Sequence, residues 1–311
     1  MSTSNAGAPA AGGRGLPLWL LLAIVLLAWG GNWPITKLAL ADAPPLWFTA
    51  TRITLAAVLI AVIARVAGDP ILPDRPARAR LAVIGLCQVA LLLSLTTISL
   101  RYLPASQAVL IAYSLPLWTW VIGRMLGDEP PSRAKLPGLL IGFGGLVLLV
   151  GPQAMADWGS DPLLGAALVL ISTLGWATGT CLYRGLPPAR SFWPQLFWQI
   201  AVSVPPVWLA HFWFEPGLGP RWTGQLGFLL AYNVVVPMTL AFWCWLRVLK
   251  VMRASTASQM IMLAPVVGFT SSAWMFDEPL PPLLLVSAAL ILGGSWLTVR
   301  VDRAAARPAA R

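Results

Sequence analysis

Long apolar blocks recur along this chain from about residue 17 to residue 300, and they limit the folds open to it. Each block holds about 20 residues, the length at which an α-helix crosses a hydrocarbon core roughly 30 Å thick. Only 10% of the 311 residues are charged, whereas about 25% are charged in an ordinary soluble domain. The sequence therefore predicts an all-α integral membrane protein.

Basic residues in the short connections predict how the helices are oriented. Ten spanning helices are expected, at 17–40, 44–65, 80–101, 104–125, 135–152, 162–183, 191–213, 223–247, 253–276 and 280–300. With a cytoplasmic N-terminus, the outside connections contain only Lys37, Arg101 and Arg221, which satisfies the positive-inside rule. Both termini are thus predicted in the cytoplasm, residues 1–15 as a disordered segment and residues 302–311 as a basic tail. This orientation explains the net charge of +10 without a nucleic-acid partner.

An internal repeat divides the chain into two related halves. Two stretches align without a gap at a constant spacing of 149 residues. The matching pairs are Ala105-Ser106-Gln107-Ala108 with Ala254-Ser255-Thr256-Ala257, Pro116 with Pro265, Asp128-Glu129-Pro130 with Asp277-Glu278-Pro279, Gly144-Gly145 with Gly293-Gly294, and Arg101 with Lys250. A weaker similarity joins Trp29-Gly30 to Trp176-Ala177. The repeats are therefore predicted at 16–152 and 153–301, with five helices each.

An odd number of helices in each repeat has a consequence for topology. The second half must enter the membrane upside down, which predicts Asp128-Glu129 inside and Asp277-Glu278 outside. Inverted repeats are typical of secondary transporters, in which substrate binds near the membrane midplane between the halves. We therefore expect a carrier that works by alternating access. A passive channel is the weaker alternative, because open pores usually arise from oligomeric symmetry.

These motifs resemble the drug/metabolite transporter (DMT) superfamily, specifically its EamA-type ten-helix branch. The resemblance rests on Trp29-Gly30-Gly31-Asn32-Trp33-Pro34 with Lys37, on Arg52 in the second helix, and on the elements shared by both halves. Within this branch, the abundance of Trp is similar to that of bacterial YddG-type amino-acid exporters. The resemblance implies export of aromatic and other neutral amino acids. It also implies a central cavity lined by the first, third, fourth, sixth, eighth and ninth helices.

Polar and aromatic residues at similar depth in these helices are the candidates for contact with cargo. They are Trp29, Asn32, Trp33, Gln88, Tyr113, Trp118, Trp176, Thr180, Tyr232, Asn233, Gln259 and Met262. Hydrogen bonding between helices explains any single one of them equally well. Arg52 could hold a carboxylate or phosphate of the cargo, although snorkelling to the interface or capping of carbonyls explains it better. Pro116 and Pro265 interrupt helical bonding and are predicted as hinges, with a static kink as the alternative.

Acidic residues are predicted to be absent from the membrane centre, because all eleven lie in connections or near block ends. Proton-coupled carriers commonly use a buried carboxylate, so transport without proton exchange is expected. A membrane-embedded enzyme would need a nucleophile and base, an acid pair or a metal cluster. His211 is the single histidine, near the outer end of the seventh block, and the three cysteines lack metal-ligand spacing. No enzymatic activity, metal or cofactor is therefore predicted.

Glycines gather on the fifth and tenth helices and predict close packing there. They are Gly138, Gly142, Gly144, Gly145, Gly293 and Gly294. These two helices are expected to contact each other or a second copy of the chain, so a homodimer is one prediction. The frequent Ala, Arg, Pro and Leu indicate a GC-rich bacterial gene and hence the inner membrane. A nucleotide-sugar or drug carrier is the rival function, but nucleotide sugars would need several cavity cations, and Arg52 is the one clear candidate.

Overall fold

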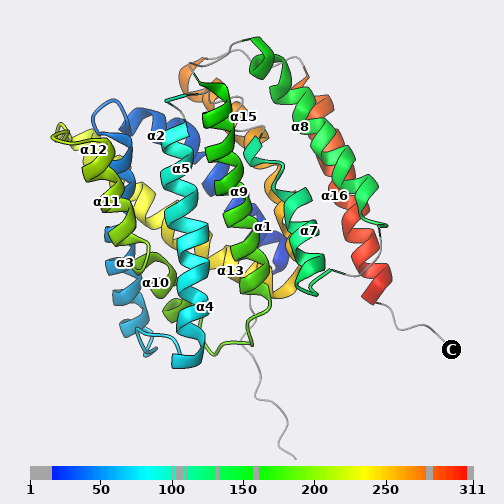
Figure 1. The fold of residues 1–311 in the computed structure, drawn as a ribbon, viewed down its shortest axis with the longest axis horizontal. Coiled ribbons are helices and arrows are strands. Elements are labelled where there is room, and N and C mark those ends of the chain that lie inside the picture. The colour runs from blue at the N-terminus through cyan, green and yellow to red at the C-terminus, as the bar shows by residue number, and fades with distance from the viewer. Residues whose placement is uncertain are drawn as a thin grey trace, which may run out of the picture.

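The structure is a computed structural model that describes residues 16–99, 101–102, 108, 111–129, 133–156, 161–277 and 283–306. All regular structure within these residues is helical (Figure 1). Six of the described helical stretches are long and apolar enough to cross a membrane. They are Leu18–Thr36, Pro45–Val66, Arg75–Ser99, Pro162–Arg184, Gly224–Val251 and Leu284–Ala305. The described chain is thus an all-helical protein of the membrane type.

The helices fall within or close to the blocks of apolar sequence. Those of the first half are α1 (Leu18–Gly30), α2 (Asn32–Ala39), α3 (Pro45–Val66), α4 (Arg75–Gly85), the π-helix η1 (Leu86–Leu91), α5 (Leu92–Ser99), α7 (Leu115–Met125) and α8 (Leu136–Ala156). Those of the second half are α9 (Pro162–Arg184), α10 (Trp193–Ala201), α11 (Val204–Phe214), α12 (Gly224–Asn233), the π-helix η2 (Val234–Ala241), α13 (Phe242–Val251), α14 (Ala254–Ile261), α15 (Ala264–Phe276) and α16 (Leu284–Ala306).

The expected start of the third block, residue 80, was wrong, because α4 begins at Arg75. Pro76 occupies the first turn, where its missing N–H costs nothing. Arg78 donates from Nε to the carbonyl oxygen of Pro73 at 2.9 Å and so fixes the entry to the helix. Arginine is a good helix former. Arg75, Arg78 and Arg80 therefore form the first turns of α4.

Several helices are interrupted inside their blocks, and proline or glycine marks each break. Gly31 separates α1 from α2, and the pair Met262-Leu263 separates α14 from α15. Pro265 lies in the first turn of α15. Pro116 lies in the first turn of α7, and this helix begins directly after the turn at Tyr113-Ser114. Proline cannot donate a backbone hydrogen bond in a helix interior, but it fits the first turn. Both prolines therefore stand where one helical segment ends and another begins.

The two halves of the sequence are interleaved in space. α1 packs against α13 and α15, α3 against α10 and α11, and α7 against α9 and α14. A single large apolar core joins residues from both halves, including Ile53 and Trp245. The stretches 16–152 and 153–301 therefore share one core.

Glycines set the close approach of α8 and α16, which run side by side at the right of Figure 1. A Cβ added to Gly138 would lie 2.8 Å from the carbonyl oxygen of Gly294. A Cβ added to Gly145 would lie 2.9 Å from the carbonyl oxygen of Ser287. Small residues let helix backbones approach in this way. The expectation that the glycine-bearing helices pack on each other is confirmed.

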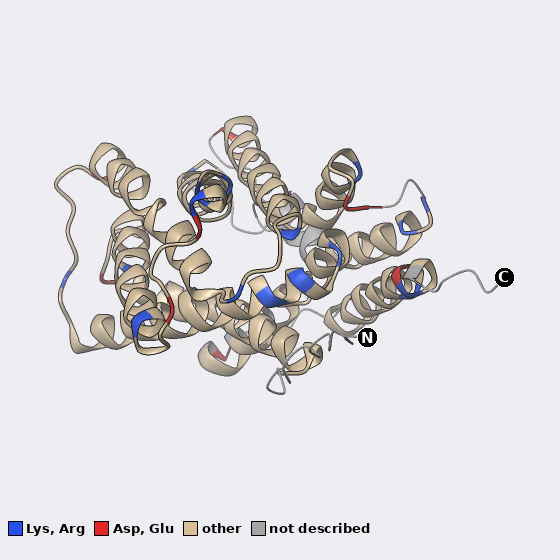
Figure 2. Ribbon diagram, turned by 90° about the horizontal axis from the view of Figure 1, so that it is seen from below, with Lys and Arg blue, Asp and Glu red and all other residues tan. Residues whose placement is uncertain are grey.

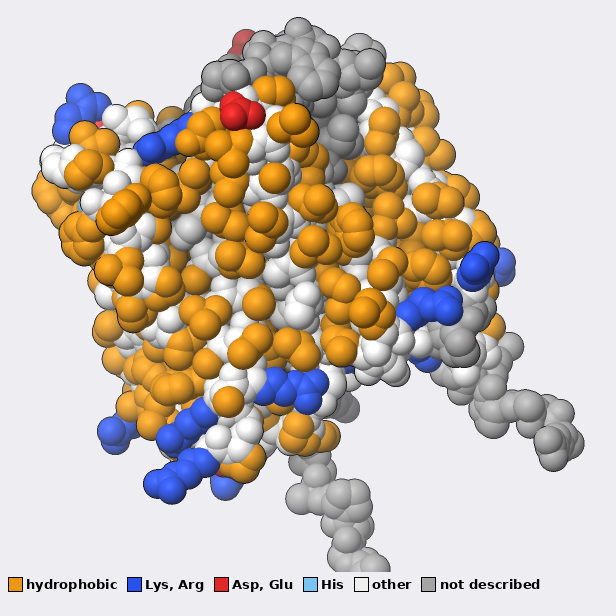
Figure 3. Space-filling model, viewed as in Figure 1, with side chains coloured by type: hydrophobic (Ala, Val, Ile, Leu, Met, Phe, Trp, Pro, Cys, Tyr) orange, Lys and Arg blue, Asp and Glu red, His pale blue; other side chains and the backbone are white. Residues whose placement is uncertain are grey.

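Charged side chains are unevenly distributed over the surface. Hydrophobic side chains cover the flanks of the molecule in Figure 3, and Lys and Arg side chains gather mainly along its lower edge. Figure 2, seen from below, shows many blue segments at this end, where the last turn of α16 also lies. A second, smaller basic group lies at the opposite end of the molecule in Figure 3. An apolar belt with charges at its two ends is the surface that a bilayer-spanning bundle requires.

Candidate functional site

Four aromatic rings from three helices meet in the centre of the bundle. The ring centroid of Trp29 on α1 lies 5.5 Å from that of Trp176 on α9. It lies 5.2 Å from Phe242 and 5.7 Å from Trp245, both on α13. Edge-to-face and tilted contacts at these distances are favourable. We call these four residues the aromatic cluster; it joins helices of both halves and contains two predicted site residues, Trp29 and Trp176.

Two π-helical segments lie against this cluster. Pro237 lies inside η2, where it offers no N–H, and its carbonyl oxygen accepts a hydrogen bond from Trp29 Nε1 at 3.2 Å. Thr239 donates back to the carbonyl oxygen of Val234 at 2.7 Å. Short π-helical segments inside α-helices occur frequently at functional sites. Neither π-segment was predicted, although a proline within the apolar block is a sequence signal for η2.

The other π-helix, η1, carries Gln88 to the same region. Gln88 donates from Nε2 to Thr180 Oγ1 at 2.9 Å. Thr180 lies one turn after Trp176 on α9, so both occupy the same face. Gln88 Oε1 and Trp176 Nε1 are buried and lack a hydrogen-bond partner among the residues described. An unsatisfied buried polar group costs about 1–3 kcal/mol, so these two atoms have unused capacity to bind a ligand.

Arg52 on α3 is the most unusual residue of the region, because its charge is buried without a counter-ion in the described structure. Its side chain donates from Nη1 to Asn233 Oδ1 at 3.1 Å and lies over the ring of Phe48 at 5.5 Å. The residue is 9% exposed, and no described carboxylate forms an ion pair with it. Its Nε has no partner among those same residues. The described contact of the guanidinium is thus a side-chain amide oxygen inside the bundle, rather than a helix carbonyl or an exposed interface.

Arg52 and Trp29 bind the same helical stretch. Asn233, the partner of Arg52, ends α12, and Pro237, the partner of Trp29, follows in η2. The two anchors are four residues apart, about 6 Å along a helix axis. The guanidinium group and the aromatic cluster thus contact neighbouring turns of one helix. This combination offers a cationic group beside aromatic rings in the apolar interior.

Of the remaining candidates, Trp118 and Asn32 have hydrogen-bond partners one turn away in sequence. Trp118 donates from Nε1 to Ser114 Oγ at 3.0 Å, and both Trp118 and Tyr113 pack against the main core. Asn32 donates from Nδ2 to Thr36 Oγ1 at 3.0 Å within α2. The side chain of Trp33 lies outside the described structure. Tyr232, on α12 beside Asn233, is half-buried.

Gln259 and Met262 on and beside α14 have partners in the packing of α8 and α16, while Gln259 Oε1 has no hydrogen-bond partner among the described residues. Gln259 donates from Nε2 to the carbonyl oxygen of Gly138 on α8 at 2.8 Å. Met262 belongs to a separate apolar cluster with Leu146, Leu284 and Ile291. The glycine face of α8 makes room for the amide, so this side of α14 serves helix packing. The position of a residue along a predicted block gives its depth in the membrane, but it does not tell which neighbouring helix the side chain faces.

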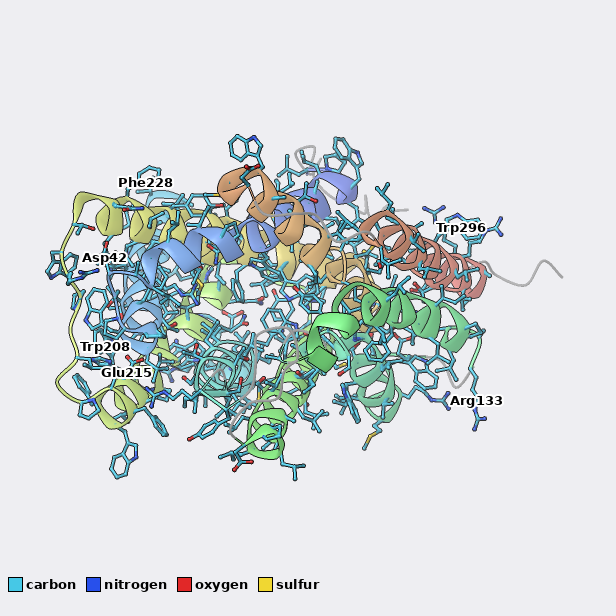
Figure 4. All side chains as sticks on the ribbon, turned by 90° about the horizontal axis from the view of Figure 1, so that it is seen from above. Asp42, Arg133, Trp208, Glu215, Phe228 and Trp296 are labelled. Carbon is cyan, nitrogen blue, oxygen red and sulfur yellow. The ribbon has the colours of Figure 1, made fainter. Side chains whose placement is uncertain are left out.

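Sequence reasoning missed a buried polar site at the end of α11. Glu215 is 2% exposed, and its carboxylate accepts hydrogen bonds from the backbone N–H groups of Leu46 and Trp47. His211 Nδ1 lies 2.9 Å from Glu215 Oε2. Figure 4 shows Glu215 close to Trp208, whose ring packs edge-on against that of His211. Glu215 follows α11 and Glu129 follows α7, at the ends of helices as predicted, but both are buried, Glu129 at 5% exposed.

Comparison with known proteins identifies relatives over nearly the whole chain. The model of the EamA-like transporter family matches residues 17–151 and 163–300. The uncharacterized transporter YvbV of Bacillus subtilis is 29% identical over 282 residues, covering 88% of this chain and 88% of that protein. A Salmonella typhimurium protein named as a probable amino-acid metabolite efflux pump is 24% identical over 302 residues, covering 92% of this chain and 96% of that protein. A crystal structure superposes with a TM-score of 0.77 at 18% identity, covering 93% of this chain and 99% of that one.

Proposed function

The chain belongs to the EamA-like transporter family, and we propose that it carries small neutral or zwitterionic metabolites, with aromatic and other neutral amino acids as the expected cargo. The proposed membrane is a bacterial inner membrane, and the proposed direction is export. One distant relative is named as an amino-acid metabolite efflux pump. A transporter function needs no catalytic group, and family membership supports transport over catalysis.

The observation that carries the cargo proposal is the buried Arg52 with a neutral partner. A buried charge that lacks a counter-ion is costly, and a cargo carboxylate would supply the missing charge. The Nη1 atom is held by Asn233 at 3.1 Å, so Nε remains as a further donor for the cargo. One guanidinium suits one carboxylate. A nucleotide sugar carries more negative charge and would require more cations, which makes it the weaker candidate.

The aromatic cluster supports the second half of the cargo proposal. Trp29 and Trp176 offer ring faces and edges to an apolar or aromatic side chain. Gln88 Oε1 can accept a hydrogen bond from an ammonium group of a zwitterion. An amino acid has an apolar side chain, an ammonium group and a carboxylate, and each of these finds a matching protein group here.

Alternating access between two inverted five-helix repeats is the proposed mechanism, with ten spanning helices and both termini in the cytoplasm. Three observations support it: the 149-residue repeat, the matching helix breaks at Pro116 and Pro265, and the excess of basic residues at one end of the bundle. Discontinuous helices at the binding site are common in such carriers. We propose that the two prolines act as hinges.

Transport is proposed to proceed without proton exchange. The buried carboxylates of Glu129 and Glu215 lie beyond the ends of α7 and α11, where hydrogen bonds to other protein groups engage them. A proton carrier would need a carboxylate that contacts the cargo region. Uptake into proteoliposomes is therefore expected to persist when the pH is equal on both sides.

The test compares substrates with and without a carboxylate in proteoliposomes. Purified protein is assayed for saturable uptake of radiolabelled tryptophan, phenylalanine and leucine, and of tryptamine, which lacks the carboxylate. Loss of a charge-assisted hydrogen bond costs about 1.5–3 kcal/mol, so Arg52→Met is expected to raise the amino-acid KM by about 10- to 100-fold. Arg65→Met, at the exposed end of the same helix, is the matched control and is expected to leave the KM unchanged.

Two results would overturn the proposal. Unchanged amino-acid KM in Arg52→Met would show that the guanidinium does not bind the cargo carboxylate. Absence of saturable uptake for every amino acid, together with saturable uptake of a nucleotide sugar or a cationic drug, would replace the cargo class. Uptake that required a pH gradient would overturn the proposal of transport without proton exchange and would leave the cargo proposal unchanged.

A further inference from the structure

A buried network of ion pairs ties helix ends together at one end of the bundle. Lys135, directly before α8, is 1% exposed, and its Nζ lies 2.7 Å from Glu129 Oε2 and 2.7 Å from Asp302 Oδ1. It also donates to Ser255 Oγ at 3.1 Å and to Thr256 Oγ1 at 3.3 Å, both in the first turn of α14. Glu129 follows α7, and Asp302 lies near the end of α16. A single ammonium group thus links four helix ends.

Neighbouring charges extend this network to a fifth and a sixth helix. Asp128 pairs through Oδ1 with Arg184 Nε at 2.5 Å at the end of α9, and its Oδ2 accepts from the N–H of Ala254 at 3.2 Å. Arg184 also donates to the carbonyl oxygen of Leu249 on α13 at 3.0 Å. Arg253 Nε lies 3.2 Å from Asp302 Oδ1. The positions of Asp128 and Arg184 agree with the helix dipoles. Asp128 lies at the start of α14, and Arg184 lies at the ends of α9 and α13.

The six ions balance one another. Three cations, Lys135, Arg184 and Arg253, face three anions, Asp128, Glu129 and Asp302. Each side-chain oxygen of Glu129 has a partner, since Ser255 donates to Oε1 at 2.5 Å while Lys135 binds Oε2. We call these six residues the ion latch. Such a network favours one geometry, because displacement of Lys135 or Glu129 leaves a buried charge without its partner.

The 149-residue sequence register shows which ions of the latch recur in the repeat. In the 149-residue register, Asp128 and Glu129 match Asp277 and Glu278, so the acids recur. The ions that pair with them do not recur. The positions that match Lys135, Arg253 and Asp302 are held by Leu284, Pro104 and Gln153. The two ends of the bundle therefore differ by sequence in the groups that can lock them.

We propose that the ion latch holds this end of the carrier closed and biases the resting protein toward the state that is open at the other end. With the proposed orientation, the latch lies on the cytoplasmic side. The inference rests on the proposed alternating-access function. Ion pairs suit this role because water hydrates the separated ions when the end opens, which keeps the closed and open states close enough in energy to exchange.

A native cysteine lies directly behind the latch and can report its opening. Cys181 on α9 is 2% exposed, and its Sγ contacts the carbonyl oxygen of Thr119 at 3.5 Å. Gly123 separates it from the latch: a Cβ added there would lie 2.9 Å from Glu129 Cγ and 3.7 Å from Cys181 Sγ. Water and a small water-soluble maleimide reach Cys181 from this end once Glu129 moves away.

The test measures the labelling rate of Cys181 in full-length protein in lipid nanodiscs, with Cys87 and Cys244 replaced by Ala. Lys135→Met removes the central cation, and Asp302→Asn removes one acid at a half-buried position in the last turns of α16, where folding is less at risk. Both variants are expected to label at least about fivefold faster. Arg221→Gln breaks an exposed ion pair with Asp42 and serves as the matched control with an unchanged rate.

A second reporter separates opening from general loosening of the fold. Cys244, on α13, is fully buried and is used alone in a protein that lacks Cys87 and Cys181. Unchanged Cys181 labelling in Asp302→Asn overturns the proposal, as does an equal rise for Cys181 and Cys244. If Lys135→Met does not fold, Asp302→Asn decides alone. The assay uses no cargo, so failure of the amino-acid transport assay would overturn the cargo proposal and leave the latch intact.

Discussion

Glu215 is expected to stabilise the protein by capping a helix that lies far from it in sequence. α3 begins after Pro44, whose side chain cannot accept a hydrogen bond from the free N–H groups of the first turn. Glu215 supplies that acceptor from the end of α11: Oε1 lies 3.0 Å from the N–H nitrogen of Leu46, and Oε2 lies 3.1 Å from that of Trp47. His211 binds the same carboxylate at 2.9 Å. Removal of the carboxylate therefore leaves three buried polar groups without their partner.

The size of the effect follows from these contacts. Loss of a cap costs about 0.5–2 kcal/mol, and loss of a hydrogen bond to a charged group costs about 1.5–3 kcal/mol when the site is dry. The residue is 2% exposed, so solvent replaces little of the loss. Because the terms overlap, we expect Glu215→Ala to destabilise by about 3 kcal/mol. On the scale of large soluble domains this corresponds to a fall in melting temperature of about 6–10 °C.

The measurement is thermal unfolding in detergent followed by tryptophan fluorescence. Glu215→Gln keeps one acceptor oxygen and is expected to lose about half as much stability. Asp74→Asn is the control, because Asp74 is exposed at the start of α4 and makes no capping hydrogen bond. A melting temperature for Glu215→Ala that differs from that of Asp74→Asn by less than about 2 °C would refute the capping argument.

Three further outcomes are expected. Gly294→Val is expected to abolish the monodisperse peak in size-exclusion chromatography, because its Cβ would collide with the α8 backbone, whereas Gly293→Ala, which has open space, behaves normally. Trp29→Leu removes the central ring and its bond to η2 and is expected to lower kcat/KM for aromatic cargo at least tenfold in the uptake assay, while exposed Trp213→Leu does not. Gln88→Leu is expected to raise the KM about 5- to 10-fold for amino acids, because it removes the unpartnered Oε1, and to lower the melting temperature by about 2–4 °C, because it also removes the buried hydrogen bond from Nε2 to Thr180 Oγ1.

The helical character and several packing surfaces could be predicted because they depend on local sequence. An apolar block of about 20 residues has few alternatives to a helix in a membrane. The glycines of α8 and α16 predicted a close contact, since the absence of a side chain acts whichever helix comes near. Pro116 and Pro265 likewise lie at helix breaks, because proline excludes the same backbone hydrogen bond in any context.

The polar interactions could not be predicted, because each depends on a partner that is distant in sequence. Glu215 binds backbone groups of residues 46 and 47, and Lys135 binds Asp302. Position near a block end predicted where these residues lie along the helices but not their burial, and the folded end of the bundle leaves Glu215 2% and Lys135 1% exposed. The partner of Gln259 was likewise not predictable: its Nε2 donates to the carbonyl oxygen of Gly138, which is 121 residues away in the sequence.

The proposed carrier combines hinges at matching positions of its two halves with an ion latch at one end only. A carrier that must exchange two states needs similar backbone movements in its two halves, and the paired breaks at Pro116 and Pro265 provide equivalent positions for them. If the side chains were equally symmetric, neither state would be favoured. Lys135 pairs with acids in one half, while Leu284 occupies its matching position in the other. Because a difference of a few kcal/mol decides which state is populated, we expect loss of Lys135 to shift the resting state of the proposed carrier without a change at Pro116 or Pro265.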